Sequence, residues 1–215
     1  MSDTFPLSSG AEVRLTNGRS ERVVVCVNGG QGGEVDGTWS ATVEWLVKRL
    51  APTFPGLGFA EVRYRTKSWK QFEGCVADAR AAVVEYGGTG TLLLGFSMGG
   101  AVAIATADEA SVERIVGLAP WIPDQLELET LHGKRLDVLH GSLDRYLPGI
   151  PGVSPANSRK GFDRARALGS PGSYTMIPGG LHGVAVRLPG GTLVPLPRAS
   201  RWLRLVAAQL ERFAV

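Results

Sequence analysis

Several features that mark special classes of protein are scarce or missing in this sequence. It has only two cysteines, Cys26 and Cys75, which lie far apart in apolar surroundings. This distribution predicts two buried, reduced thiols and argues against a disulfide framework or a paired metal site. No apolar run approaches the roughly 18 residues that span a bilayer, so we expect no membrane partner. The polar segment 1–10 has no basic stretch followed by an apolar one, so we expect no signal peptide and a cytoplasmic location.

Charge of a single sign is not concentrated anywhere along the chain. The 215 residues include 23 Lys and Arg against 20 Asp and Glu, a formal net charge of +3, with no long basic run. A protein that binds nucleic acid through its phosphates needs a basic patch or stripe, so we expect no nucleic-acid partner. The sequence does not define the oligomeric state.

The bulk composition is that of an ordinary soluble globular protein. Hydrophobic residues make up 44% and charged residues 20% of the chain. The length suits one domain with a sizeable core, and no repeat or low-complexity linker divides it. We therefore expect residues 1–215 to form a single domain.

Short apolar runs alternate with helical patterns along the whole chain. The expected strands cover residues 11–14, 22–27, 59–65, 91–96, 114–118, 136–140 and 173–177. The expected helices cover residues 39–50, 69–86, 98–108, 157–168 and 200–213. This alternation predicts an α/β fold with a mostly parallel central sheet and helices on both faces. Thr38 and Ser200 are the expected N-caps of the first and last helices, and Trp39 is expected to pack in the core.

The segment Gly95-Phe96-Ser97-Met98-Gly99 falls between an expected strand and an expected helix. In that context Gly-x-Ser-x-Gly is typical of a nucleophile elbow, a sharp turn that holds a serine at its apex. Glycines on either side of the serine let the strand and the helix pass close together. The start of the helix lies beneath Ser97, where its free amides favour developing negative charge. The motif alone also fits a plain strand-to-helix turn that accommodates only small residues.

Two further loop residues complete a set that could act with Ser97. In a parallel sheet, ligands bind at the carboxyl ends of the strands, and Asp144 and His182 each follow an expected strand. A serine needs a base to remove its proton, and the base needs an acid to orient it. The chain order Ser97, Asp144, His182 is the order expected when a Gly-x-Ser-x-Gly elbow is catalytic.

Other carboxylates and histidines are weaker candidates for these roles. Asp124 also follows a strand, one earlier than Asp144, whereas Asp137 lies inside a strand and should point away from the site. His132 lies in a polar connector, and His140 is expected to be a structural hydrogen-bonding residue beside the loop. The glycine-rich loop 28–33 lacks the Lys-Ser/Thr pair of a phosphate-binding P-loop and the glycine spacing of a dinucleotide site.

Taken together, these motifs resemble those of an α/β-hydrolase over nearly the whole chain. Two shorter phrases, 62–65 and 116–121, resemble a group of small actinobacterial α/β-hydrolases whose substrates are poorly defined. The motifs that carry the resemblance are Asn28-Gly29-Gly30, Gly95-Phe96-Ser97-Met98-Gly99-Gly100, His140-Gly141-Ser142-Leu143-Asp144 and Gly180-Leu181-His182-Gly183.

The resemblance implies a role for each residue of the candidate site. It implies Ser97 as nucleophile, Asp144 as the acid of the triad and His182 as the base. It also implies an oxyanion hole formed by the backbone N–H groups of Met98 and Gly30. The chain departs from the family at Asn28, where histidine is usual, and this change concerns the shape of the loop more than the chemistry.

The spacing of the motifs bears on the substrate. The segment between Ser97 and Asp144 holds one helix–strand unit and a connector, so we expect an open site without a large cap domain. Trp121, directly after a strand, is the expected wall of an apolar, substrate-binding pocket. We expect a serine hydrolase of the esterase type that cleaves a small or medium acyl ester, with no cofactor and no metal. The alternatives are an acyltransferase, thioesterase or peptidase with the same triad, and a non-catalytic binding protein on this scaffold.

Overall fold

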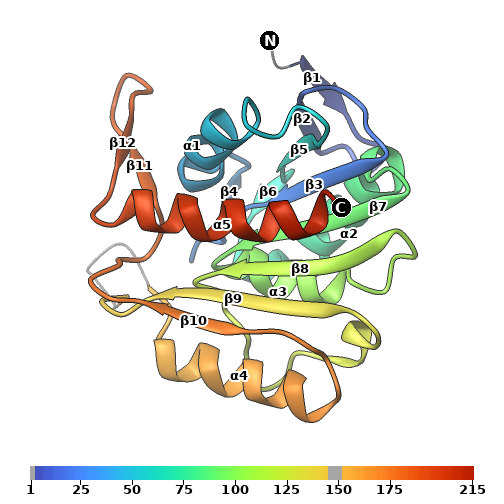
Figure 1. Ribbon diagram of the computed structural model, residues 1–215. Coiled ribbons are helices and arrows are strands. Elements are labelled where there is room, and N and C mark those ends of the chain that lie inside the picture. The colour runs from blue at the N-terminus through green and yellow to red at the C-terminus, as the bar shows by residue number, and fades with distance from the viewer. Residues whose placement is uncertain (1–2, 145–151) are drawn as a thin grey trace.

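The computed structural model of the protein describes residues 3–144 and 152–215, and its centre is a sheet of eight strands (Figure 1). The strands are β1 (Asp3–Pro6), β2 (Glu12–Thr16), β3 (Arg22–Val27), β5 (Gly58–Arg63), β7 (Gly90–Phe96), β8 (Val112–Leu118), β9 (Arg135–Gly141) and β10 (Tyr174–Ile177). Their spatial order is β1-β2-β5-β3-β7-β8-β9-β10. All pairs from β5 to β10 are parallel, whereas β1 and β2 are antiparallel additions at one edge.

The central strands are buried on both faces of the sheet. In β3, Val23, Val25 and Val27 belong to one hydrophobic core, and Val24 and Cys26 belong to the other. Side chains alternate between the two faces of a strand, so a strand covered on both sides must be apolar at every position. This explains the unbroken apolar run in this part of the sequence. Cys26 and Cys75 are free and buried, as predicted.

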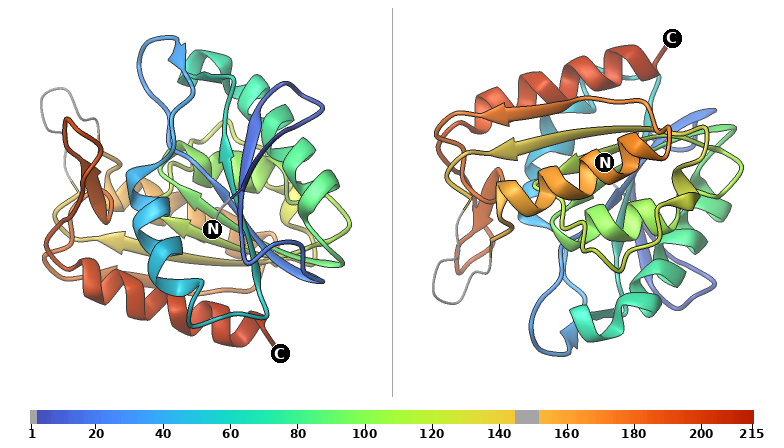
Figure 2. Two further views of the ribbon diagram at one scale, coloured as in Figure 1. Left: turned by 90° about the horizontal axis from the view of Figure 1, so that it is seen from above. Right: turned by 90° about the horizontal axis from the view of Figure 1, so that it is seen from below.

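Helices cover the two faces of the sheet (Figures 1 and 2). One face carries α1 (Ala41–Leu50) and α5 (Ala199–Phe213), and the other carries α2 (Phe72–Tyr86), α3 (Met98–Ala105) and α4 (Pro155–Ala167). The α/β fold with a mostly parallel sheet and helices on both faces is thus confirmed. No helix in the described part of the chain is long and apolar enough to cross a membrane.

Several short elements lie in the segments that connect the main strands and helices. The strands β4 (Val35–Asp36) and β6 (Thr66–Lys67) pair with each other, and β11 (Ala185–Arg187) forms a hairpin with β12 (Leu193–Pro195) (Figure 1). Two 3₁₀ helices are present, η1 (Trp69–Gln71) and η2 (Glu129–Leu131). Between β8 and β9, η2 is the only helix that the structure describes, so no large cap domain is inserted there.

Three predictions about helix ends are wrong. Ser40, not Thr38, caps α1, because its hydroxyl accepts the N–H of Val43 at 3.3 Å. Trp39 therefore precedes the helix and does not join the core; it is half-buried, with the Arg14 guanidinium 4.6 Å from its ring centre. Ser200 lies inside α5, which follows a residue in the left-handed region, Arg198, with φ 70°.

Other differences concern segments whose sequence pattern is weak. The strand β1 has four exposed residues and no apolar alternation, so nothing in its pattern predicts a strand. The expected helix from Trp69 begins instead as the 3₁₀ turn η1, where the hydroxyl of Ser68 accepts the N–H of Lys70. The helix α3 ends at Ala105, three residues before the predicted end.

Candidate active site

Ser97 lies at the turn between β7 and α3 in a conformation that is rare for a residue with a side chain. Its φ is 56° and its ψ is −120°. Three backbone hydrogen bonds of 2.9 Å hold it there: its N–H donates to Leu118, and its carbonyl accepts from Gly100 and Trp121. A strained backbone persists only where the surrounding structure determines it, and such strain is common at functional sites.

The glycines of the elbow are required by close backbone packing. A Cβ on Gly95 would collide with the carbonyl group of Gly99. A Cβ on Gly99 would lie 2.5 Å from the carbonyl oxygen of Val27. The strand β7, the helix α3 and the end of β3 thus meet without room for a methyl group, and this contact aims Ser97 at the edge where the strands end.

The side chains of Ser97, His182 and Asp144 form one chain of hydrogen bonds. The Nε2 atom of His182 lies 3.1 Å from the Oγ atom of Ser97, and its Nδ1 atom lies 2.7 Å from an Oδ2 oxygen of Asp144. The three residues follow β7, β9 and β10, so the sheet brings together groups that are distant in sequence. Ser97 is 7% exposed and Asp144 is 1% exposed, which shields both from water.

His140 is a further partner of Asp144. Its fully buried ring places Nε2 3.1 Å from Asp144 Oδ2 and 3.1 Å from the Val153 carbonyl oxygen. Its Nδ1 atom has no partner among the described residues, so the contacts of this ring fit a proton on Nε2 that is donated to these oxygens. The sequence predicts a hydrogen-bonding role for His140 beside the loop, but not that its partner is the candidate acid.

Asp144 is held as a carboxylate by three donors. Besides the two histidines, the N–H of Val153 donates to Oδ1 at 3.0 Å. Burial alone would raise the pKa of Asp144, but the hydrogen bonds from His140 and His182 outweigh burial and lower the pKa below its ordinary value. Asp144 is therefore ionised at neutral pH and can stabilise a positive charge on His182.

The loop that carries His182 is held against α1. The imidazole packs on Phe96, with ring centres 5.0 Å apart. Two residues further on, the N–H of Val184 donates to the buried hydroxyl of Thr42 at 3.0 Å. The hairpin that follows is anchored by Arg187, which pairs with Glu44 of α1 at 2.9 Å. These contacts set the direction from which His182 approaches Ser97.

Asn28, which stands where histidine is usual in the family, shapes the glycine-rich loop. Its side-chain amide donates to the carbonyl of Thr38 at 2.8 Å, and its side-chain oxygen accepts the N–H of Gly29 at 2.7 Å. The hydroxyl of Tyr64 donates to the Asn28 carbonyl at 3.0 Å. Gly29 is thereby held against Ser97, whose Cβ would lie 3.2 Å from a Cβ added at Gly29.

Two backbone N–H groups near Ser97 have no hydrogen-bond acceptor among the described residues. The amides of Gly30 and Met98 donate no hydrogen bond within the described part of the chain. Gly30 cannot carry a side chain, because a Cβ there would collide with the ring of Trp69 and the sulfur of Met98. The loop and the start of α3 therefore lie in contact next to the serine, as an oxyanion hole requires.

The other candidate acids lie apart from this cluster. Asp124 is exposed and pairs with Lys160 at 2.7 Å. Asp137 is buried in β9 and bonds Arg135 and Ser173, on the side away from the site, as predicted. His132 is exposed and follows η2. The described residues contain no group of three or more His, Cys, Asp or Glu side chains that could hold a metal ion.

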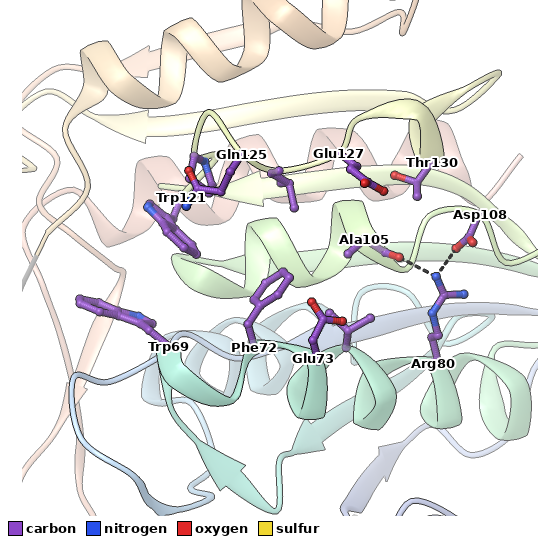
Figure 3. Close-up of a pocket in the computed structure, with 13 residues that line it drawn as sticks. Trp69, Phe72, Glu73, Arg80, Ala105, Asp108, Trp121, Gln125, Glu127 and Thr130 are labelled. Atoms are coloured by element: carbon purple, nitrogen blue, oxygen red, sulfur yellow. Dashed lines mark hydrogen bonds and ion pairs between the residues drawn. The ribbon is translucent and has the colours of Figure 1, made fainter.

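A groove of about 630 Å³ is lined by Trp69, by residues of α2, by Ala105 and Asp108, and by the segment 121–130 (Figure 3). Trp121 lines it, as predicted, together with Trp69 and Phe72. The prediction of an apolar pocket is wrong for the rest of the groove, because charged side chains line its far part. These are Glu73, Arg80, Asp108 and Glu127. Its position directly after a strand marked Trp121 in the sequence, whereas no sequence signal marked the charged residues.

Comparison with known proteins agrees with this architecture. A family model described as "Alpha/beta hydrolase family" matches residues 24–214. A sugar hydrolase from Lactococcus lactis superposes with a TM-score of 0.68 at 18% identity, covering 99% of this chain and 98% of its own. The Pyrococcus furiosus esterase PF2001 superposes with a TM-score of 0.67 at 15% identity, covering 100% and 91%. At such low identity the structural likeness shows the fold alone. No curated protein sequence matches the chain.

Proposed function

The chain belongs to the alpha/beta hydrolase family, and from that membership we propose that it is a serine hydrolase of the esterase type. The observation that carries the proposal is the continuous path of hydrogen bonds from Ser97 Oγ through the His182 ring to Asp144. A core-filling turn would need none of these three polar groups to face one another. The fold neighbours include proteins named as esterases, which supports ester substrates.

The geometry supports a stepwise acyl transfer. Asp144 accepts a hydrogen bond from the Nδ1–H group of His182, which keeps Nε2 unprotonated and able to take the proton of Ser97. The Ser97 oxygen then attacks the ester carbonyl carbon, and the carbonyl π electrons move onto its oxygen. The Gly30 and Met98 amides donate to this oxyanion, and one such donor is worth roughly 3 kcal/mol in the transition state.

Collapse of this intermediate breaks the bond to the alcohol. The protonated His182 gives its proton from Nε2 to the leaving alkoxide, and an acyl group remains on Ser97. Water then attacks the acyl group while His182 removes its proton, and a second collapse releases the acid and restores the Ser97 hydroxyl. No cofactor takes part in this cycle. The absence of an inserted cap between β8 and β9 supports small or medium acyl esters that reach an open site.

Labelling with a fluorophosphonate probe tests the role of Ser97. We expect the wild-type protein to be labelled at Ser97 and to hydrolyse p-nitrophenyl acetate and butyrate. Ser97→Ala should lose labelling and lower kcat by about 10³-fold or more. Ser200→Ala, an exposed serine of α5, is the matched control and should behave as wild type.

Two results would contradict the proposal. The first is folded wild-type protein that the probe does not label. The second is ester turnover that persists in Ser97→Ala. Parallel assays with an acyl-thioester and a peptide amide would assign the leaving group, because the same triad can cleave all three substrates and they differ in the bond that breaks.

A further inference from the structure

The groove has two lining residues that contact the backbone around Ser97. Trp121, at its near end, donates its backbone N–H to the Ser97 carbonyl at 2.9 Å. Trp69, opposite, donates its backbone N–H to Gln31 at 3.1 Å, and its ring lies against Gly30 and Met98. Both tryptophans thus belong to the frame of the proposed oxyanion hole. Trp69 and Trp121 stand at one end of the groove (Figure 3), and this is therefore the end nearest to Ser97.

The groove and His182 lie on opposite faces of the sheet. Phe72 and Trp121 pack against the core that contains α2 and α3, whereas Phe96 and Val184, the neighbours of His182, belong to the core with α1 and α5. His182 must protonate the leaving alcohol, so the alcohol half of an ester lies on the His182 side. The acyl half is bonded to the same carbon and points away from it, toward the groove.

The near end of the groove is aromatic. Phe72 and Trp121 meet edge to face with ring centres 6.4 Å apart. Trp69 is 41% exposed, which is unusual for so large an apolar side chain and leaves its ring available to a ligand. Flat aromatic rings pack favourably against such walls.

The far part of the groove carries excess negative charge. Glu73 rises from α2 and Glu127 lies on the opposite wall (Figure 3), and neither has an ion-pair partner among the described residues. Among the described residues that line the groove, the only Lys or Arg is Arg80, which is already paired at 2.6 Å with both Asp108 and Glu109. A protein with a net charge of +3 thus presents a locally acidic groove beside its nucleophile.

We propose that this groove is the acyl-binding subsite, and that it selects acyl groups that carry an aromatic ring followed by a positively charged group. The inference rests on the proposed function, because it places the acyl half by reference to Ser97 and His182. The aromatic end accommodates the ring, and Glu73 and Glu127 attract the charge.

A pair of isosteric esters tests the charge preference. The substrates are p-nitrophenyl 3-(4-X-phenyl)propanoates in which X is trimethylammonium or the neutral tert-butyl group of the same shape. X is remote from the carbonyl, so the ratio of the two kcat/KM values reports binding of X. For the wild-type protein we expect a ratio of about five in favour of the cation at low ionic strength, because exposed carboxylates contribute modestly and salt screens them.

Variants locate the source of this ratio. In Glu73→Gln/Glu127→Gln the ratio should fall to about one, whereas Glu21→Gln/Glu211→Gln, which removes the same charge outside the groove, should keep the wild-type ratio. Acetate esters of 2-(4-X-phenyl)ethanol carry the same X on the alcohol half and should show a ratio near one. Trp69→Leu should lower kcat/KM for the 3-phenylpropanoate relative to the acetate.

The outcomes separate the two proposals. Turnover of p-nitrophenyl acetate that depends on Ser97, combined with a wild-type ratio of one, overturns the subsite and leaves the esterase intact. A preference that is unchanged in Glu73→Gln/Glu127→Gln, or that appears only for the alcohol half, also overturns the subsite. If the protein shows no ester turnover that depends on Ser97, both the esterase and the subsite proposals are overturned.

Discussion

The two halves of the candidate site are held in different ways. Ser97 is held by backbone hydrogen bonds of its own N–H and C=O groups. Gly95 and Gly99 let β7, α3 and the end of β3 pack so closely that no methyl group fits between them. Asp144 and the loop of His182 are held largely by hydrogen bonds to side chains, among them His140 and Thr42. The serine half is therefore sensitive to added atoms, and the acid–base half is sensitive to the loss of polar groups and to pH.

The largest effect is expected when an atom is added to the serine half. The added Cβ of Gly99→Ala would lie 2.5 Å from the Val27 carbonyl oxygen, so the backbone must move, and we expect a loss of about 4 kcal/mol in the free energy of unfolding. Gly74→Ala, in α2, is the control: nothing lies within 4 Å of its added Cβ, so it should stabilise the protein by roughly 0.5–1 kcal/mol. Urea denaturation measures both. Equal stability of the two variants would contradict the steric argument.

The next effect concerns Glu44, which ties the hairpin after His182 to α1. Burial would raise its pKa, but hydrogen bonds from Lys48, Arg187 and Arg14 lower it from 4.5 to about 2. A lowered folded-state pKa stabilises the protein above the unfolded value, and that stability is lost as the pH falls through the folded value. This lowering of the Glu44 pKa corresponds to about 3 kcal/mol in the free energy of unfolding at neutral pH.

Glu44→Gln should therefore be less stable than wild type by about that amount at pH 7. The difference should shrink as the pH falls from 4.5 toward 2, because wild-type Glu44 becomes protonated over this range. Chemical denaturation at a series of pH values measures this. A stability difference that is the same at neutral and acidic pH would show that Glu44 acts through packing and not through charge.

The smallest effect is expected at His140. His140→Phe keeps a ring stacked near Tyr174 but removes the donor to Asp144, so kcat for ester hydrolysis should fall about tenfold. The carboxylate becomes more basic and favours protonated His182 more strongly, so the acidic limb of the kcat/KM profile should move to higher pH. His140→Gln, which retains a donor near the position of Nε2, should recover most of the activity. A Phe variant with the wild-type pH profile would reduce His140 to a packing residue.

Sequence patterns predict the strong elements of this fold but not its weak ones. The buried strands and the long helices carry clear apolar periodicity, because each packs against a large core. The strand β1 and the hairpin β11–β12 carry no such pattern, because pairing with a neighbouring strand stabilises them and few of their side chains are buried. Trp39 was misplaced for a related reason: cation–π contact with Arg14 is a tertiary interaction that helical spacing does not reveal.

The sequence by itself determines the elbow and the chain order of Ser97, Asp144 and His182. A glycine-flanked serine between a strand and a helix is a local pattern, and parallel strands bring the loops that follow them to one edge. Only the tertiary structure decides that His140 donates to Asp144, that Asn28 shapes the glycine-rich loop, and that Glu73 and Glu127 face one groove. These facts depend on side-chain directions across elements that are distant in sequence, and local spacing carries no information about them.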